Sequence, residues 1–304
     1  MVYLLWNPTA GKGRAAHVMP QIEKALRDRG CWYHIAPTEY PGHAQILAQE
    51  AVREGAEALI VAGGDGTLQE ASSGLIGSNT PLAGIPLGNG NDFIRHLADL
   101  RHCRSEQERI AFCLETVFAR KTRRLDVIKV SHLKHGAAHY ALNIGNTGLD
   151  AEAADYATRL KKYVSSASYV ISMIRCAFTH QPFRAAIEID GKKQNHLLTL
   201  AAVCNGDRYG GGFIVSPSAR VDDGYLNVCL VKHMTRLKIL ALFPLILMGG
   251  KYSRLREVEN SLCRKILIDY EGPRKICLDG NIFTWEGPLC FEVLPKALSV
   301  LSLI

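Results

Sequence analysis

The amino-acid sequence predicts an α/β protein with two domains, an N-terminal α/β domain built on a parallel sheet and a β-rich C-terminal domain. Over residues 1–124, short apolar runs alternate with periodic, charged segments. From Arg124 on, apolar runs follow one another with Asp-Gly turns between them. The length of 304 residues is enough for two domains and a sizeable core.

The first part of the chain has four short apolar runs that we interpret as strands, at residues 2–6, 33–36, 58–62 and 82–86. Between and after them lie predicted helical segments at residues 15–29, 43–54, 68–76, 92–97 and 105–119. Strands that alternate with helices of this length are typical of βαβ units. The pattern therefore predicts a parallel sheet covered by helices on both faces.

Glycine-rich loops follow three of these predicted strands: Asn7–Gly13 (NPTAGKG), Ala62–Leu68 (AGGDGTL) and Leu87–Arg95 (LGNGNDFIR). The carboxyl ends of parallel strands meet at one edge of a sheet, and ligands bind at that edge. Closely spaced glycines let the backbone approach a ligand and expose its N–H groups. A helix N-terminus after the second loop would add partial positive charge, so this edge suits phosphate.

Asp65 distinguishes the second loop from the known phosphate-binding loops. A carboxylate inside an anion site repels phosphate unless a cation lies between them, which suggests a nucleotide held through Mg²⁺. The loop has neither the Walker A sequence nor the G-x-G-x-x-G pattern. The structural alternative is a tight turn whose Asp caps the following helix.

The second part of the chain reads as strands linked by turns. The predicted strands lie at residues 125–130, 139–144, 185–189, 197–204, 226–231, 265–270 and 275–278, and helical stretches are predicted at 151–180 and 235–248. Asp190-Gly191, Asp223-Gly224 and Asp279-Gly280 are turn signals. We therefore expect an antiparallel sandwich, and we expect residues 291–304 to return to the first domain.

The composition is that of an ordinary globular protein, with 47% hydrophobic and 21% charged residues and a net charge of +7. No nucleic-acid-binding motif accompanies the positive charge, so an anionic membrane surface is the better partner. No apolar run reaches the roughly 18 residues of a membrane-spanning helix, and no signal peptide is visible. Nine cysteines without a C-x-x-C pair or zinc spacing indicate reduced, mostly buried thiols in a cytosolic protein.

The motifs NPTAGKG, GGDGTLQE and PLGNGNDFIR, in this order and spacing, resemble the diacylglycerol kinase catalytic domain. More closely, the chain resembles the soluble bacterial lipid kinases of the diacylglycerol and sphingosine kinase superfamily. Residues 205–212 (NGDRYGGG), 216–219 (SPSA), 222–226 (DDGYL) and 278–280 (LDG) continue the resemblance. GGDGT alone is shared with NAD kinases.

The resemblance implies a Rossmann-like nucleotide-binding domain of the NAD kinase and diacylglycerol kinase type over residues 1–124, joined by the tail 291–304. It implies a lipid-binding β-sandwich over residues 125–290, with the active site in the cleft between the domains. It also implies a nucleotide site formed by Asn7, Gly11, Lys12, Thr38, Gly63, Gly64, Asp65, Gly66, Thr67 and Asn89.

Lys12 can meet phosphate as a point charge, and a solvated loop lysine is the alternative, which the residues alone do not distinguish from it. Thr38 follows the second strand, where an N-cap is its alternative. Asp92 and Arg95 lie three residues apart at a predicted helix start, and therefore on one face of the helix. In the structural interpretation, Asp92 is the N-cap and Arg95 is its partner on the surface. The resemblance instead implies that both act in the cleft, with Asp92 and Asp65 around magnesium-bound water.

Asp279 is the predicted general base, because a lipid hydroxyl is a very weak acid and a carboxylate near it helps to remove its proton. A turn Asp before Gly280 is the alternative. The family's motif generally reads DGE, whereas this chain has Asn281. The chain also has Asn89 where the family usually has Thr. The resemblance further implies a second magnesium site, built from the Asp223 carboxylate and the backbone carbonyls of Arg220 and Tyr225.

These observations predict an ATP-dependent lipid kinase that uses Mg²⁺, resides in the cytoplasm and binds transiently at the inner face of the membrane. We expect a lipid substrate, peripheral membrane association, no nucleic-acid partner and a possible homodimer. Residues 169–175 and 237–248 are candidates for the apolar trough, and basic residues flank the second of them. A soluble-substrate kinase of the NAD kinase type and a nucleotide-binding regulatory module without transfer remain as alternatives.

Overall fold

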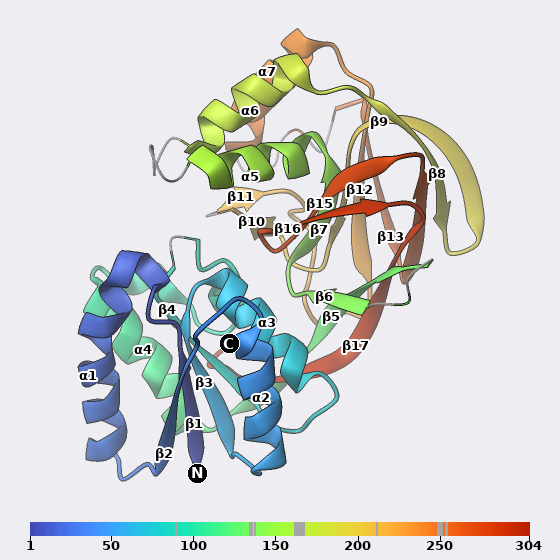
Figure 1. The fold of residues 1–304 in the computed structure, drawn as a ribbon. Helices are drawn as coiled ribbons and strands as arrows, with labels where there is room; N and C mark the ends of the chain where they lie inside the picture. The colour runs from blue at the N-terminus through green and yellow to red at the C-terminus, as the bar shows by residue number, and fades with distance from the viewer. Residues whose placement is uncertain are drawn as a thin grey trace. The chain divides into compact units, whose positions relative to one another are not determined.

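The structure is a computed structural model that divides into two compact units, Met1–Asp126 with Pro295–Ile304, and Val127–Leu294 (Figure 1). It describes residues 1–88, 90–133, 136, 138–160, 168–210, 212–247, 252 and 255–304, with the backbone alone for 242–247. Two strands, β5 (Thr122–His132) and β17 (Leu289–Leu301), run from one unit into the other.

The first unit is built on a parallel sheet in the order β17-β4-β3-β1-β2. Its strands are β1 (Val2–Trp6), β2 (Tyr33–Pro37), β3 (Ala58–Gly63) and β4 (Leu82–Pro86). Every residue of β3 and β4 is buried, whereas most of the edge strand β2 is accessible to solvent. Because both faces of the central strands are covered, these strands have continuous apolar sequences.

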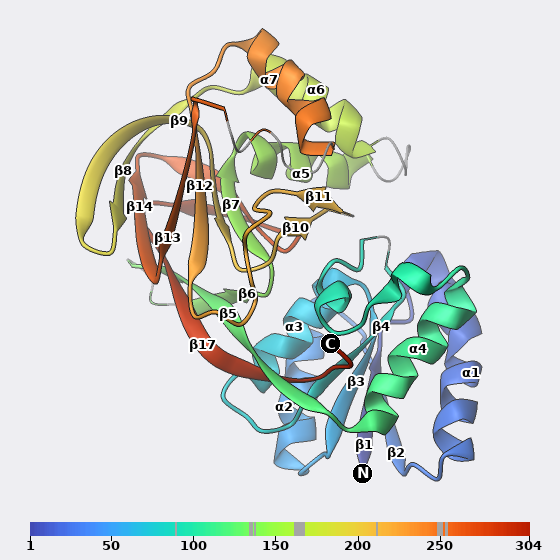
Figure 2. The same ribbon diagram turned by 180° about the vertical axis from the view of Figure 1, so that it is seen from behind.

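Four helices pack on this sheet: α1 (Arg14–Asp28), α2 (His43–Arg53), α3 (Asp65–Leu75) and α4 (Glu106–Ala119). Figures 1 and 2 show α1 and α4 on one face and α2 and α3 on the other. Residues 93–96 form a short 3₁₀ helix after the third glycine-rich loop. This arrangement brings the ends of β1, β3 and β4, and the loops that follow them, to one edge of the sheet.

The second unit is a β-rich sandwich of mostly antiparallel strands with helices on one side. Its strands are β6 (Ala138–Ala141), β7 (Ile144–Gly148), β8 (Phe183–Ile189), β9 (Lys192–Cys204), β10 (Arg208–Tyr209), β11 (Phe213–Ile214), β12 (Leu226–Lys232), β13 (Val258–Cys263), β14 (Lys265–Tyr270), β15 (Pro273–Leu278) and β16 (Asn281–Glu286). Its helices are α5 (Leu149–Leu160), α6 (Ser168–Thr179) and α7 (Arg236–Leu247).

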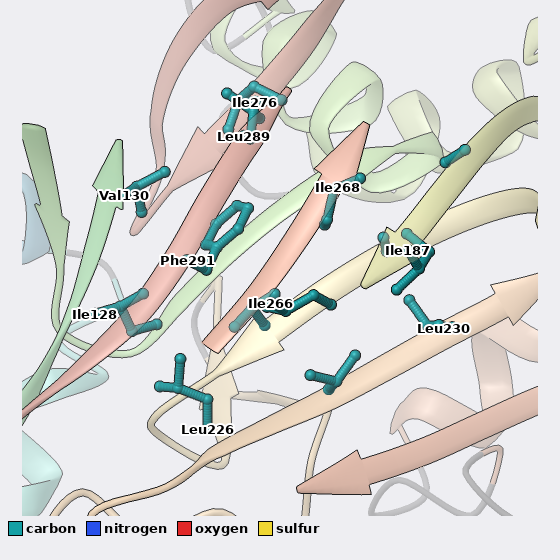
Figure 3. Close-up of a cluster of buried hydrophobic side chains, with 14 of the residues drawn as sticks. Ile128, Val130, Ile187, Leu226, Leu230, Ile266, Ile268, Ile276, Leu289 and Phe291 are labelled. Atoms are coloured by element: carbon teal, nitrogen blue, oxygen red, sulfur yellow. The ribbon is translucent and has the colours of Figure 1, made fainter. Parts of the chain in front are cut away.

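Two hydrophobic clusters lie on opposite faces of the central strands of this unit. On β12, Leu226, Val228 and Leu230 belong to the sandwich interior, part of which Figure 3 shows. The alternate residues Cys229 and Val231 pack instead against α5, α6 and α7. Because successive side chains of a strand point to opposite faces, β12 has apolar residues toward both faces over Val228–Val231. This requirement explains why these positions do not alternate between apolar and polar residues.

The predicted fold class, an N-terminal α/β unit with a parallel sheet and a β-rich C-terminal unit, is confirmed. Two elements differ from expectation. The strand predicted at residues 139–144 is two strands, because the chain bends at Leu142 and Asn143 between β6 and β7. The helical stretch predicted at 151–180 contains two helices, α5 and α6, and residues 161–167 lie outside the described part. The strands β10, β11, β13 and β16 were not predicted.

All nine cysteines are free thiols, and seven of them are buried. The expectation of mostly buried cysteines is therefore confirmed, and their reduced state stays a prediction. Within the described residues, no helix combines the length and hydropathy required to cross a bilayer.

Candidate active site

The three glycine-rich loops of the first unit are in direct contact with one another. A Cβ atom on Gly88 would lie 2.7 Å from the Cα of Gly64, and one on Gly11 would lie 2.6 Å from the carbonyl oxygen of Leu87. Real Cβ atoms do not approach other atoms so closely, so glycine is required where the loops touch. The three loops that the sequence singled out are thus brought together at the predicted edge of the sheet.

Polar side chains join the first two loops. The Asn7 side-chain amide donates to the Thr67 hydroxyl at 3.1 Å, and the Asn7 amide oxygen accepts from the N–H and hydroxyl of Thr9. Gly63 faces Thr67 closely, since a Cβ there would lie 2.7 Å from the Thr67 Cβ. Asn7, Gly63 and Thr67 therefore fix the shape of the loops, whatever they bind.

The first loop has three consecutive residues with positive φ: Gly11 at 60°, Lys12 at 60° and Gly13 at 88°. The left-handed conformation costs a non-glycine residue such as Lys12 roughly 1–2 kcal/mol. Residues held in such conformations cluster at functional sites. The Lys12 side chain is exposed, and Thr38 lies just after β2, where its N–H donates to the Trp6 carbonyl at 2.9 Å.

Asp65 joins the second loop to the third. It is the first residue of α3, and Gly64 is the N-cap, so Asp65 does not cap the helix. Its carboxylate instead accepts the N–H groups of Asn91 at 2.7 Å and Phe93 at 3.3 Å. Burial raises the pKa of Asp65, and the neighbouring charge of Asp92 raises it further. Asp92 is only 2% exposed and Asp65 is half-buried, so the two neighbouring carboxyl groups lie where a cation is favoured.

Two further residues of the third loop were predicted to belong to the site, Asn89 and Arg95. Arg95 is exposed, and Asn89 lies outside the described residues. Asn91, which we had not singled out, organises this loop: its side chain accepts from the Gly88 N–H at 2.9 Å and donates to the Gly88 carbonyl at 2.7 Å. Its φ is 53°, a conformation that Asn tolerates better than most residues, so an Asn directly after the glycines of the loop was the signal available in the sequence.

Asp279 lies in the second unit, in the turn between β15 and β16, with a φ of 48°. Its carboxylate accepts the backbone N–H groups of Leu142 at 2.5 Å, Asn143 at 3.0 Å and Ile144 at 2.9 Å. These hydrogen bonds occupy most of the acceptor capacity of one carboxylate and hold the bend between β6 and β7. The general-base role of Asp279 stays a prediction, and the structure adds a second role beside it.

The predicted second metal site lies at the turn before β12. Asp223 is exposed, and its carboxylate accepts the N–H of Tyr225 at 3.0 Å. The Arg264 guanidinium lies 5.0 Å from the centre of the Tyr225 ring, and Arg220 is exposed. Among the described residues, no group of three or more His, Cys, Asp or Glu side chains could hold a metal ion. A cation here would need backbone carbonyls and water besides Asp223.

An apolar pocket lies in the second unit, between the sheet and the helical layer. Its lining consists of Leu149, Asp150, Tyr169, Met173, Thr199, Leu200, Tyr209, Phe213, Val215, Val231, Ile239 and Tyr252. Asp150 is the one carboxylate among them. It accepts from the hydroxyls of Tyr169 and Tyr209 and, at 2.8 Å, from the side-chain amide of Asn146. Sequence reasoning missed this network, because a single Asp in a helical segment gives no local signal.

Burial raises the pKa of Asp150 from 3.8 to about 6. A carboxyl group whose pKa is raised by folding destabilises the folded state as the pH rises through that value. We therefore expect Asp150→Asn to gain stability relative to wild type as the pH rises from 4 to above 6, by on the order of 2 kcal/mol. Urea unfolding of both proteins at pH 4 and above pH 6 measures this difference, and a pH-independent difference would contradict it.

Comparisons with known proteins cover both units. Residues 1–130 match the family model described as diacylglycerol kinase catalytic domain. Residues 143–302 match the model described as YegS C-terminal NAD kinase beta sandwich-like domain.

Individual relatives match along most of the chain. A protein of Mycobacterium tuberculosis named diacylglycerol kinase is 28% identical over 99% of this chain and 94% of its own length. A protein of Chromohalobacter salexigens named "probable lipid kinase YegS-like" is 31% identical over 74% of this chain and 71% of its own. A crystal structure from Bacillus anthracis, described as a candidate diacylglycerol kinase, is 27% identical with a TM-score of 0.76, over 99% of this chain and 96% of that one.

Proposed function

The chain belongs to the family of lipid kinases of the diacylglycerol kinase and YegS type, and we propose that it transfers the γ-phosphate of ATP to a hydroxyl of diacylglycerol or a related lipid. Phosphoryl transfer depends mainly on positioning and on neutralising charge. The loops around Gly11, Gly64 and Gly88 have closely packed glycines, and glycine loops of this kind suit nucleotide phosphates.

One observation carries this proposal: the half-buried carboxylate of Asp65 joins two glycine-rich loops and lies close enough to Asp92 to have its pKa raised. Two neighbouring carboxyl groups in a phosphate site are compatible only if a cation reduces their repulsion. Asp65 and Asp92 would hold Mg²⁺ directly or through its waters, since Mg²⁺ usually keeps several waters and binds one or two carboxylates. The metal would neutralise the phosphate charge that develops during transfer.

The apolar pocket beside α5 and α6 supports a lipid acceptor. Its walls consist mainly of aliphatic and aromatic side chains, as pockets for apolar ligands do. We propose that it receives part of the acyl portion of the lipid. Of the two segments that the sequence suggested for a trough, α6 contributes Tyr169 and Met173 and α7 contributes Ile239.

The direct test is incubation of the purified protein with γ-labelled ATP, Mg²⁺ and a mixed lipid extract, followed by separation of labelled lipids. We expect one or a few labelled lipids, and none with Asp65→Ala. A parallel reaction with NAD in place of lipid tests the soluble-substrate alternative. Labelled NAD phosphate without labelled lipid would overturn the proposal.

The magnesium site that we propose at Asp223 gives a second prediction, for the stability of the protein in Mg²⁺. Asp223→Ala should reduce the rise in Tm that Mg²⁺ produces, because a metal that binds only the folded state stabilises it. Activity should fall less than with Asp65→Ala, since the site would order the loop before β12 and not the reacting phosphate. Thermal unfolding with EDTA and with Mg²⁺ measures both proteins. An identical Mg²⁺-dependent shift in the two would remove Asp223 from any metal site.

A nucleotide-binding regulatory module remains a second candidate, and one observation favours it. The carboxylate of the predicted base, Asp279, already accepts three backbone N–H groups, and the family's next carboxylate is absent at Asn281. Nucleotide binding without transfer to any lipid would support this module. The cytoplasmic location, the transient contact with the inner membrane face and the homodimer stay predictions.

A further inference from the structure

Helix α6 has an apolar face that is exposed to solvent. Val170, Ile171, Ile174 and Phe178 are 37%, 42%, 48% and 50% exposed, respectively. At about 100° per residue, these positions share one side of the helix. The opposite side carries Ser168, Ser172, Met173, Cys176 and Ala177, all of which are buried. We call the exposed side, with its four apolar residues, the outer face of α6.

A helix that is apolar on both sides is normally buried all round. The inner side of α6 is covered, because Met173, Cys176 and Ala177 belong to the hydrophobic cluster beneath the helical layer. The outer face therefore exposes a row of large apolar side chains of the kind that marks interaction sites. Isolated exposed apolar residues need no explanation, but four on one side of one helix do.

The charged residues on α6 and α7 themselves are all basic. Helix α6 carries Arg175 and no acidic residue, and α7, which packs against it, begins with Arg236, Leu237 and Lys238 and also has no acidic residue. Arg175, Arg236 and Lys238 are exposed, and Leu237 is 78% exposed. Glu257 pairs with Lys238, so the two arginines supply most of the free positive charge.

The inner side of the same two helices lines the apolar pocket, through Tyr169 and Met173 on α6 and Ile239 on α7. A surface that binds the outer face of α6 is therefore separated from the pocket by the thickness of one helix. Apolar side chains with a basic rim are typical of elements that lie in a membrane interface.

We propose that the outer face of α6 docks the protein on an anionic phospholipid bilayer, with Val170, Ile171, Ile174 and Phe178 in contact with the acyl region. Arg175 and Arg236 then lie at the level of the lipid headgroups. A second copy of this chain fits less well, because a two-fold contact through this face would bring the same basic residues toward one another. The inference rests on the proposed function, since docking here would bring the lipid substrate beside the pocket.

The test measures sedimentation of the full chain with vesicles of phosphatidylglycerol and phosphatidylcholine, without ATP. The variant Ile171→Ser/Ile174→Ser should bind about tenfold more weakly than wild type, because two half-exposed aliphatic side chains no longer enter the bilayer. The matched control is Leu262→Ser on β13, which removes a side chain that is 59% exposed but lies on the sheet. It should bind as wild type does.

Salt and lipid charge test the electrostatic part. Binding should fall as salt is added, and vesicles of phosphatidylcholine alone should bind more weakly, because screening and neutral headgroups both remove the attraction of the arginines. Equal binding by wild type and the α6 variant would overturn the proposal. A wild-type dimer that the α6 variant dissociates would also overturn it and assign the face to a second copy.

Kinase activity is measured separately, on lipid dispersed in detergent micelles. Because the micelle supplies substrate without a bilayer, the α6 variant should retain most of this activity. Vesicle binding without any kinase activity would leave the docking face intact and reject the kinase. If the α6 variant has kinase activity in micelles and binds vesicles as wild type does, the docking face is rejected and the proposed kinase function is kept.

Discussion

Replacing Asp65 by alanine is expected to lower kcat by about 10²–10³-fold, the usual effect of removing one electrostatic element from a reaction centre. Asp65 lies in the glycine-rich loop that we propose to bind phosphate, where a carboxylate is compatible with a nucleotide only through a cation. The apparent affinity for Mg²⁺ should fall in the same variant. Steady-state kinetics at several Mg²⁺ concentrations measures both quantities.

The same carboxylate also holds the third loop, through the N–H groups of Asn91 and Phe93, so alanine removes two functions at once. Asp65→Asn separates them in part, because the amide oxygen still accepts a hydrogen bond while the charge is gone. The pKa of Asp65 is raised by burial and by Asp92. Without a cation, ionised Asp65 therefore destabilises the folded state as the pH rises through its folded pKa. In EDTA at neutral pH, Asp65→Asn should have a Tm at least as high as that of wild type, while its kcat remains low.

A suitable control is Asp28→Ala, which removes an exposed carboxylate at the end of α1 in the same unit. It should change neither kcat nor the Mg²⁺ dependence. Near-normal kcat in well-folded Asp65→Ala would remove Asp65 from the mechanism. A lower Tm of Asp65→Asn in EDTA would show that the hydrogen bonds of Asp65 to the third loop outweigh its charge.

The strands and glycine-rich loops of the first unit could be predicted from the sequence because their signals are local. The central strands are continuous apolar runs because both faces of the sheet are covered. The loops are recognisable in the sequence by their closely spaced glycines. Their mutual contact was also predictable, because carboxyl ends of parallel strands share an edge. What the sequence did not show was the reason for each glycine, such as the approach of Gly88 to Gly64.

The parts that escaped prediction depend on residues far apart in the chain. The bend at Leu142 and Asn143 interrupts an apolar run that reads as one strand, and it is fixed by Asp279, more than a hundred residues later. The Asp150 network joins α5 to Tyr169 on α6 and Tyr209 on β10, none of which has a local motif. Strand β16 mixes polar and aromatic residues at an edge of the sheet, so its periodicity is weak.

Asp279→Asn is expected to lower kcat by about 10²–10⁴-fold if Asp279 is the general base, with a much smaller effect on nucleotide affinity. The structure adds a second consequence. Asparagine has one acceptor oxygen where the carboxylate has two, so at least one of the N–H groups of Leu142, Asn143 and Ile144 loses its partner. A lost partner for a buried N–H costs roughly 1–3 kcal/mol, so Tm should fall as well.

Asp190 offers a matched control for this second consequence. It precedes Gly191 in a turn of the same kind, with φ of 44° and 86°, and Asp279 precedes Gly280 with φ of 48° and 94°. Its carboxylate likewise accepts backbone N–H groups, from Arg264 and Lys265. Because Oδ1 of Asp190 accepts from both groups and these hydrogen bonds are exposed to solvent, Asp190→Asn should lower Tm less than Asp279→Asn does, and it should not lower kcat. If Asp279→Asn loses much more kcat than Asp190→Asn does, the excess loss reports the general-base role of Asp279.

Asn281→Glu completes the comparison, because it restores the carboxylate that the family usually has two residues after the base. A second acidic group there could bind Mg²⁺ or orient the acceptor, so we expect higher activity or a changed lipid preference. If Asp279→Asn and Asp190→Asn lose only stability, Asp279 is a structural residue and the base lies elsewhere. If wild type labels no lipid but Asn281→Glu does, the chain has kept the fold and the nucleotide site of a lipid kinase and has lost transfer through that one residue.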